Sequence, residues 1–218
     1  MAFTKSSMLF LFTLFISSSF IDALPLFKRD QCPIGIYQGT LLYIYPSELF
    51  IPQGIIVPVG NKYKFSLYGF GVQMYKCNSV SRTWDFVGPE ANIYNKKVLK
   101  DPEDASDYLV GNHFFQKEPV NGGRVTWEST IDCDDSSLIS NLLTQIPSPD
   151  GPKNLPWLLL IATAHNGDGV FSDVTFTIRI NTKQGIAPPV DECGNNYQDG
   201  DIYRSEYSTR YLFYNLDQ

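Results

Sequence analysis

Apolar residues stand at every second position in several segments of this chain, and this alternation constrains the fold more than any other feature. The pattern is clearest at 62–67, 174–180 and 207–213. Successive side chains of a β-strand point to opposite faces, so this spacing is typical of a strand that buries one face. Most of the apolar residues are β-branched or aromatic, and such side chains pack well on a pleated sheet. These segments therefore predict strands.

The segment 174–180 shows how the two faces of such a strand differ. One face carries Val174, Phe176, Ile178 and Ile180, and the other carries Thr175, Thr177 and Arg179. A half-buried strand would bury the first face and leave the second face polar.

The apolar run from Trp157 to Ala164 predicts a strand that is covered on both faces. It leads through the glycine-rich loop 165–169 into the strand at 174, so these two strands are expected to form a hairpin. Asn-Gly and Asp-Gly in that loop supply the positive φ angles that such turns need. The segment 136–146 fits a helix about as well as a strand, and both alternatives stay open.

Strand patterns recur along the chain after its N-terminal part, and 136–146 is the one candidate helix. A sheet has to bury one face against another layer. The sequence therefore predicts an all-β, single-domain antiparallel β-sandwich or distorted β-barrel with long loops over residues 30–218.

The first 29 residues are expected to be targeting segments. Residues 1–23 place Lys5 before an apolar run and end in a small residue, which is typical of a secretory signal peptide. Residues 24–29 form a short pro-segment that ends in Lys-Arg, a pair similar to the dibasic sites that kexin-type proteases cut in fungal secretion. We expect a mature chain that begins at Asp30 and is secreted, with an extracellular or cell-wall location.

The chain is acidic, with 17 Lys and Arg against 23 Asp and Glu and a formal net charge of −6. Nucleic-acid binding depends on Lys and Arg that displace counterions from phosphates, and anionic lipid surfaces repel a chain of this sign. We expect neither nucleic acid nor a membrane as a partner.

Four cysteines follow the predicted signal peptide: Cys32, Cys77, Cys133 and Cys193. An even number in an oxidising compartment favours a disulfide-stapled domain. None of them stands in a CxxC pair, so the spacing gives no support to a zinc site. The spacing alone leaves all three possible pairings open.

The stretch YGFGVQMYKC, at 68–77, carries Gly69 and Gly71 and raises the question of a nucleotide-binding loop. A dinucleotide loop needs a third glycine at its sixth position and a helix after it. The sixth position is Met74, and 72–77 has a strand pattern. We interpret the glycine pair as a bulge or bend between two strand segments and predict no cofactor.

Several motifs follow one another in an order known from one protein family: GVQMYKC at 71–77, GPEA at 88–91, VGNHF at 110–114, LPWLLL at 155–160, GVFSDVTFTIRINT at 169–182 and APPVDEC at 187–193. They resemble the uncharacterised family catalogued as domain of unknown function 3455, whose members are largely secreted bacterial and fungal proteins. The resemblance implies a secreted β-rich domain without a settled activity. Fungal members are sometimes labelled malate dehydrogenase, which the missing third glycine and helix argue against.

The same resemblance implies a disulfide pairing. Members of the family usually carry cysteines at the positions that match Cys77 and Cys193, which implies that these two residues pair. That pairing leaves Cys32 with Cys133.

Aromatic side chains are the main candidates for a binding surface, because exposed Tyr and Trp bury a large area at low entropic cost. We expect most aromatic residues in the core, Trp84 and Trp157 among them, and the better candidates for the surface are Trp127 and the tyrosines 203, 207, 211 and 214. The candidate binding residues are His113, Trp127, Glu128, Tyr203, Tyr207 and Tyr211.

Support for catalysis or metal binding is weak. His113 is one of two histidines and would be able to act as a general base, but a histidine satisfied by neighbouring backbone groups is the commoner case. Asp85, Glu90 and Glu128 are able to supply the two carboxyl groups of a glycosidase. The acidic residues around Cys133 and Cys193 lack the spacing of a calcium loop and are expected to be solvated. No catalytic residue and no metal site is predicted.

These observations predict a secreted, non-catalytic binding or surface-associated β-domain whose partner is an extracellular polysaccharide or a protein surface. One alternative is a secreted hydrolase that uses Asp or Glu near His113. The other is an extracellular structural protein that self-assembles through an exposed edge strand.

Overall fold

The computed structural model describes residues 45–47, 49–97 and 107–217. The predicted signal peptide (1–23), the predicted pro-segment (24–29) and Cys32 lie outside these residues, so the statements about them stay predictions. Within the described part of the chain, no helix has the length and apolar character needed to cross a bilayer.

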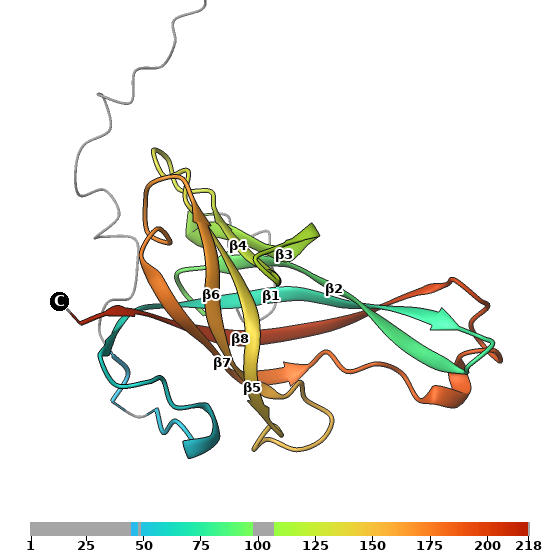
Figure 1. The fold of residues 1–218 in the computed structure, drawn as a ribbon. Coiled ribbons are helices and arrows are strands. Elements are labelled where there is room, and N and C mark those ends of the chain that lie inside the picture. Colours follow the sequence, from blue (N-terminus) through green and yellow to red (C-terminus); the bar gives the residue numbers. More distant parts are fainter. Residues whose placement is uncertain (1–44, 48, 98–106, 218) are drawn as a thin grey trace, which may run out of the picture. The chain divides into compact units, whose positions relative to one another are not determined.

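Eight antiparallel strands form a closed barrel (Figure 1). They are β1 (Asn61–Asn78), β2 (Thr83–Tyr94), β3 (Leu109–Val120), β4 (Gly123–Ser129), β5 (Ser137–Ile146), β6 (Trp157–Asn166), β7 (Val174–Gln184) and β8 (Ile202–Leu216). Each strand pairs with its neighbours in the sequence, and β1 closes the barrel by pairing with β8. The all-β antiparallel prediction is confirmed, and of its two architectures the protein adopts the barrel.

The predicted strands fall inside the observed ones. The segments 62–67, 174–180 and 207–213 belong to β1, β7 and β8. The segment 136–146, which fitted a helix or a strand, is strand β5. Strands β6 and β7 pair antiparallel, as the predicted hairpin requires.

Aromatic side chains fill one end of the barrel. The rings of Phe65 on β1 and Phe213 on β8 lie 4.8 Å apart, and Trp127 on β4 contacts Phe213 at 5.6 Å. Phe171, from the loop between β6 and β7, packs against both phenylalanines. All four side chains are buried, and the burial of one phenylalanine contributes about 1.5–3 kcal/mol. This end of the barrel is a packed core.

A second apolar layer covers the outside of β6, β7 and β8. The segment 49–57 includes the 3₁₀ turn η3 (Gln53–Ile55) and places Ile55 in a cluster with Trp157 and Leu159 of β6. Strand β6 is therefore covered on both faces over Trp157–Leu160, as the apolar run predicts, whereas Ile161 is 37% exposed.

Strand β7 is buried on its polar face as well as on its apolar face. Ile178 and Ile180 belong to the outer cluster, whereas Thr177 and Arg179 are buried on the opposite face, toward the barrel interior. The half-buried prediction is wrong for this strand because the segment 49–57 covers the outside of the barrel here. The polar residues of β7 are consequently the ones that face inward.

Strands β8, β1 and β2 continue beyond the barrel as a three-stranded ribbon (Figure 1). Strand β3 pairs with β2 only over Glu90–Tyr94, and β7 pairs with β8 only from Tyr207 onward. Strand β1 pairs with β2 as far as Asn78. The connection between β7 and β8, which contains the 3₁₀ turn η5 (Val190–Glu192), returns along this ribbon.

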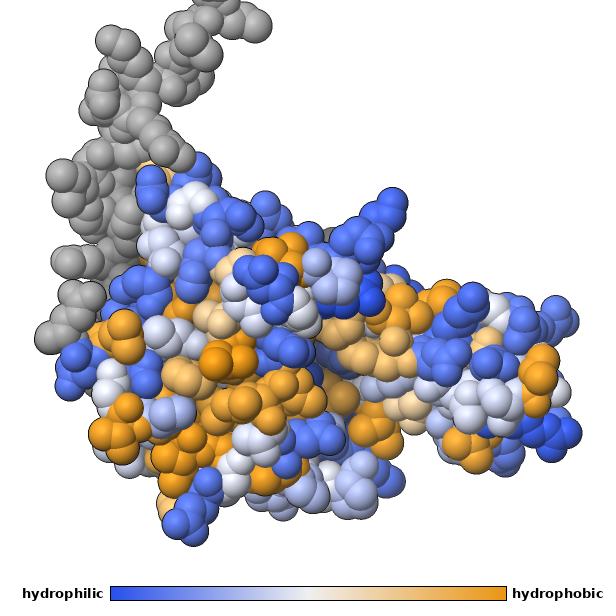
Figure 2. Space-filling view, in the orientation of Figure 1, coloured by the Kyte–Doolittle hydropathy of each residue, from blue (hydrophilic) through white to orange (hydrophobic). Residues whose placement is uncertain are grey.

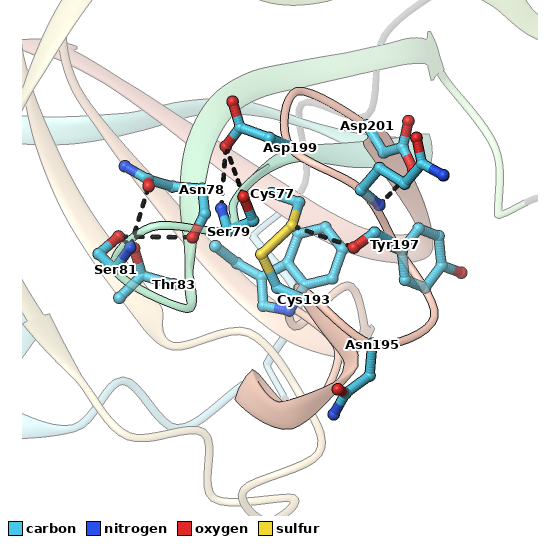
Figure 3. The surroundings of a disulfide bond; sticks show 12 residues. Cys77, Asn78, Ser79, Ser81, Thr83, Cys193, Asn195, Tyr197, Asp199 and Asp201 are labelled. Atoms are coloured by element: carbon cyan, nitrogen blue, oxygen red, sulfur yellow. Dashed lines mark hydrogen bonds between the residues drawn. A yellow bond between two sulfur atoms is a disulfide. The ribbon is translucent and has the colours of Figure 1, made fainter.

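The Cys77–Cys193 disulfide ties that connection to β1 (Figure 3). Two backbone hydrogen bonds lie beside it: the Cys77 N–H donates to the Asp201 carbonyl oxygen, and the Gly200 N–H donates to the Cys77 carbonyl oxygen, each at 2.9 Å. The pairing implied by the family resemblance is confirmed for these two cysteines. Cys133 is also disulfide-bonded, but its predicted pairing with the fourth cysteine stays a prediction.

Gly69 and Gly71 lie within β1, and the pairing of β1 with β2 runs through both without a shift. The shift lies between Met74 and Tyr75, so the strand interpretation is confirmed and the bulge predicted at the glycines is wrong. A Cβ on Gly71 would lie 2.3 Å from the Glu90 carbonyl oxygen. The close approach of β2 therefore requires a glycine at position 71.

Candidate functional site

The end of the barrel next to the ribbon holds a cavity of about 380 Å³. Figure 2 shows apolar surface around the hollow between the barrel and the ribbon. Its apolar lining includes Phe86, Phe115, Val125, Leu142, Leu158 and Leu160, and its polar lining consists of Gln73, Tyr75, His113, Gln145 and Arg179. Apolar walls with a few polar groups are typical of sites for small molecules.

The strand register explains why these side chains meet. Arg179 on β7 lies directly opposite Leu158 on β6 and Tyr211 on β8. His113 on β3 lies directly opposite Trp127 on β4. Residues opposite one another in an antiparallel pair project to the same side of the sheet, so all five side chains point into the barrel.

Arg179 is the most unusual group in the cavity. Arg179 is buried, with 9% of its surface exposed. Its Nη2 donates a hydrogen bond to the Pro156 carbonyl oxygen at 3.0 Å, and its Nε has no hydrogen-bond partner. Burial lowers the pKa of the guanidinium, while Tyr211, Tyr207 and Tyr75 raise it. An arginine nevertheless keeps its proton in proteins, so a cation lines this cavity.

His113 is a neutral group beside this cation. Its ring stacks on Trp127 with a centroid distance of 4.6 Å, and its Nδ1 lies 2.8 Å from the Thr126 carbonyl oxygen. Burial lowers the pKa of His113 to about 3. A neutral ring next to a carbonyl oxygen must donate from Nδ1, so Nε2 carries the lone pair.

Two further polar groups line the cavity. The Tyr75 hydroxyl donates to the Gly185 carbonyl oxygen at 2.8 Å, and burial raises its pKa to about 12. The Gln73 amide nitrogen is buried without a hydrogen-bond partner. A buried donor without a partner costs about 1–3 kcal/mol, so Gln73 leaves an unsatisfied polar atom in the cavity wall.

The mouth of the cavity is apolar. Phe86, from the ribbon, and Leu142, from β5, line the cavity and are still 47% and 45% exposed. The Phe86 ring contacts Tyr75 and Phe115, each with a centroid distance of 5.4 Å. An apolar solute would meet matching surface at the entrance.

The carboxyl groups considered for a glycosidase lie outside the cavity. No carboxyl group of the described residues lines it, and Asp85, Glu90 and Glu128 are exposed. Nor do the described residues contain a group of three or more His, Cys, Asp or Glu that would be able to hold a metal ion. The arrangement supplies hydrogen-bond donors, one cation and apolar walls, which suit binding.

The predicted binding residues do not form one surface. Trp127, Tyr207 and Tyr211 are 0%, 1% and 1% exposed, so these three surface candidates are core residues. They point into the closed barrel, which buries their side chains around His113. The Tyr207 and Tyr211 hydroxyls lie 3.3 Å apart. Four of the six candidates are therefore neighbours inside the barrel.

The other two candidates lie elsewhere. Glu128 is exposed on the outer side of β4. Tyr203 is half-buried in the ribbon, where its ring contacts Tyr197 at 5.7 Å and Trp84 at 6.0 Å. Trp84 is itself only half-buried in this cluster, so its predicted core position is wrong, whereas Trp157 is buried as predicted.

One acidic residue expected to be solvated is buried. Asp134 is 7% exposed, and its carboxylate accepts hydrogen bonds from the backbone N–H groups of Ser136 at 2.9 Å and Val170 at 3.0 Å. These bonds hold the β6–β7 loop over the packed end of the barrel. The carboxylate thus accepts hydrogen bonds from backbone N–H groups that would otherwise be unpaired.

Sequence reasoning missed Arg179, Gln73 and Tyr75. Arg179 stood on the polar face of a predicted half-buried strand, where a cation is ordinarily solvated. The available signal was the continuous apolar run of the preceding strand, Trp157–Ala164, which already required a cover on the outside of the sheet.

Fold and site together define a closed antiparallel barrel with an internal, mainly apolar cavity. The model of the family described as "Protein of unknown function (DUF3455)" matches residues 58–215, and the chain belongs to this family. Comparison with the curated proteins and with the solved structures found no match.

Proposed function

We propose that this protein is an exported, non-catalytic binding protein that encloses a small, mainly apolar molecule in the barrel cavity. The observation that carries the proposal is the cavity of about 380 Å³, which has apolar walls and buried hydrogen-bond donors without partners. Sites for small molecules are typically about 300–1,000 Å³, with a few polar groups that fix the orientation of the ligand. The carboxyl pair that a glycosidase needs is missing from the described lining.

Two neighbouring leucines of β5 allow a matched test. Leu142 lines the cavity, whereas Leu143 does not line it and is 51% exposed. The neutral probe N-phenyl-1-naphthylamine fluoresces more strongly in an apolar site. We expect the native protein to bind it, Leu142→Trp to weaken binding about tenfold or more by filling the entrance, and Leu143→Trp to leave binding unchanged.

Three results would count against an internal site. They are an unchanged probe fluorescence across a titration of the native protein, equal probe binding by the two tryptophan variants, and failure of a panel of small apolar solutes to displace the probe. Circular dichroism of both variants establishes that each has folded before their affinities are compared.

A groove on the outside of the barrel supports an extracellular polysaccharide as a second candidate ligand. The groove has a volume of about 420 Å³ and crosses β7, β8, β1 and β2. Tyr68 and Phe70 supply aromatic surface, and Asn181 and Lys183 supply polar groups. Aromatic faces beside hydrogen-bonding groups suit sugar rings.

A pull-down on chitin, glucan and cellulose tests this second candidate. We expect retention on at least one of these polymers and a clear loss of retention in Tyr68→Ala. Failure of the native protein to bind any of the three would remove polysaccharide from the proposal and leave the internal site unaffected.

Export is the remaining part of the proposal, and it rests on the N-terminal sequence alone. In a yeast host with a kexin-type protease, we expect the protein in the medium with Asp30 as its first residue. N-terminal sequencing of the secreted material checks this, and retention of the intact chain inside the cells would contradict it.

Self-association is a weaker alternative, because closure of the barrel pairs its strands on both sides. Among the described residues, the part of β2 before Glu90 pairs only with β1 and leaves one edge of the ribbon open. An open edge is able to pair with another chain. Light scattering that rises with protein concentration would favour this alternative.

A further inference from the structure

The Arg179 guanidinium is a buried cation without a carboxylate partner among the described residues. The ion pairs of that part of the chain all lie elsewhere, namely Lys62–Asp217, Lys64–Asp173, Lys183–Asp150 and Arg204–Glu90. The groups that face Arg179 are the hydroxyls of Tyr75, Tyr207 and Tyr211 and the neutral ring of His113. Buried charges in proteins are ordinarily paired, so this site lacks an anion.

Hydrogen bonding inside the chain does not satisfy the guanidinium. An arginine has five N–H donors, and the described residues provide Arg179 with one acceptor, the Pro156 carbonyl oxygen at 3.0 Å. Its Nε has no partner, and neither has the buried Gln73 amide nitrogen that lines the same cavity. These two nitrogen atoms lie below the cavity surface with almost no accessible area, so the site offers a ligand the positive charge and the remaining N–H groups of the Arg179 guanidinium.

A carboxylate matches this set of groups. It accepts hydrogen bonds at both oxygens, and arginine binds it through two parallel N–H···O bonds. The rest of the ligand has to be apolar, because Leu158, Leu160 and Val125 form the adjacent wall. A volume of about 380 Å³ lies at the small end of ligand sites, which favours a short or medium-length molecule.

We propose that Arg179 binds the carboxylate of a small monocarboxylic acid whose hydrocarbon part lies in the barrel cavity. This inference rests on the proposed function, because it assigns the class of ligand to the same site. Straight-chain and aromatic acids share the chemistry that the site recognises, and the test distinguishes them.

The decisive comparison keeps the ligand's hydrocarbon part and changes only its charge. Decanoate, 1-decanol and methyl decanoate are each used to displace the neutral probe from the native protein at neutral pH, and 3-phenylpropanoate is compared with 3-phenylpropanol in the same way. We expect an acid to bind about 10- to 100-fold more tightly than its matched alcohol, as charge-assisted hydrogen bonds predict. The acid with the greater preference identifies the straight-chain or the aromatic class.

Substitution of the cation separates recognition from structure. We expect Arg179→Met to lose the preference for the acid and to bind 1-decanol and the probe within about twofold of the native protein, since the neutral ligands gain little from the charge. Arg179→Lys keeps a charge without the planar fork and should retain part of the preference. Arg204→Met removes an exposed arginine that lies outside the cavity and should leave the preference intact.

The outcomes distinguish this inference from the proposed function. Equal affinities for acids and matched alcohols in the native protein would overturn the inference and leave the internal site standing. The same holds if Arg179→Met keeps the preference. If the probe and all ligands fail to bind, both proposals fall. The comparison within the native protein decides the inference even if Arg179→Met does not fold.

Discussion

Two basic side chains face the same cavity and are in different charge states. Burial holds the pKa of His113 at about 3, whereas Arg179 stays protonated because the pKa of a guanidinium starts so high. The histidine is satisfied through Nδ1 and its stacking on Trp127, which makes it a neutral part of the wall. The candidate general base of the sequence is therefore a structural residue that borders the cavity.

Because His113 is buried in its uncharged form, the stability of the protein should depend on pH. Between pH 6.5 and about 4.5 the unfolded chain protonates this histidine while the folded protein does not, so the free energy of unfolding should fall as the pH falls, by up to about 1.4 kcal/mol per pH unit. His113→Gln should flatten this slope. Urea unfolding at several pH values in this window checks the difference.

The exposed histidine on β6 provides the control for this experiment. His165→Gln replaces the other histidine in the same way and is measured over the same pH range. Slopes that are identical in the native protein and His113→Gln would show that His113 takes up its proton in the folded state.

At the scale of elements, the segment 49–57 decides which face of the neighbouring strands is polar. It covers the outside of β6, β7 and β8 with Ile55 at its centre, and this cover allows Ile178 of β7 to point outward and still be buried. The inner face of β7 is then free to carry Thr177 and Arg179. Arg179 is therefore able to face the cavity because the segment 49–57 buries the opposite face of β7.

Adjacent isoleucines allow a matched test of this cover. Ile55 is 0% exposed and Ile56 is 52% exposed. We expect Ile55→Ala to lower the free energy of unfolding by about 2–5 kcal/mol, because it leaves a void under η3. Ile56→Ala should change it by less than about 0.5 kcal/mol. Chemical denaturation of both variants measures the difference, and similar values for the two would contradict the packing described above.

At the scale of the molecule, the described domain combines a barrel that is packed at one end with a ribbon that borders the cavity at the other. The Cys77–Cys193 bond joins residues 116 positions apart and holds the long β7–β8 connection on the ribbon. Tyr75 hydrogen-bonds to Gly185 at the start of the same connection. The β7–β8 connection therefore contacts both the disulfide and Tyr75, which lines the cavity.

Removal of this disulfide should lower the stability of the protein and loosen the β7–β8 connection. We expect Cys77→Ser with Cys193→Ser to lower the free energy of unfolding by about 2–5 kcal/mol, because the unfolded chain loses a long-range constraint. Thermal unfolding measures the loss. Limited proteolysis should then cut first within 185–201, and cleavage elsewhere would show that other contacts hold this connection.

Much of the framework was predictable from the sequence, because local patterns report strand formation directly. The alternation at 62–67 and 207–213, the apolar run at 157–164 and the glycine-rich loop after it all correspond to observed elements. The Cys77–Cys193 pair followed from the family resemblance and not from spacing. The segment 136–146 was undecided because a short apolar run fits both periods.

The site was only partly predictable. His113, Trp127, Tyr207 and Tyr211 were selected from the sequence as candidate binding residues, Trp127 and the two tyrosines as surface candidates, and Arg179 was not selected. An alternating pattern shows which residues share a face of a strand, but not which face turns inward.

Local patterns in the sequence indicate strands at 62–67, 157–164, 174–180 and 207–213, because backbone sterics and side-chain periodicity act within a few residues. Closure of the sheet into a barrel, the cover by the segment 49–57 and the inward position of Arg179 depend on long-range contacts that no local pattern reports. Closure and cover bring together residues far apart in the chain, and the direction of each side chain depends on both.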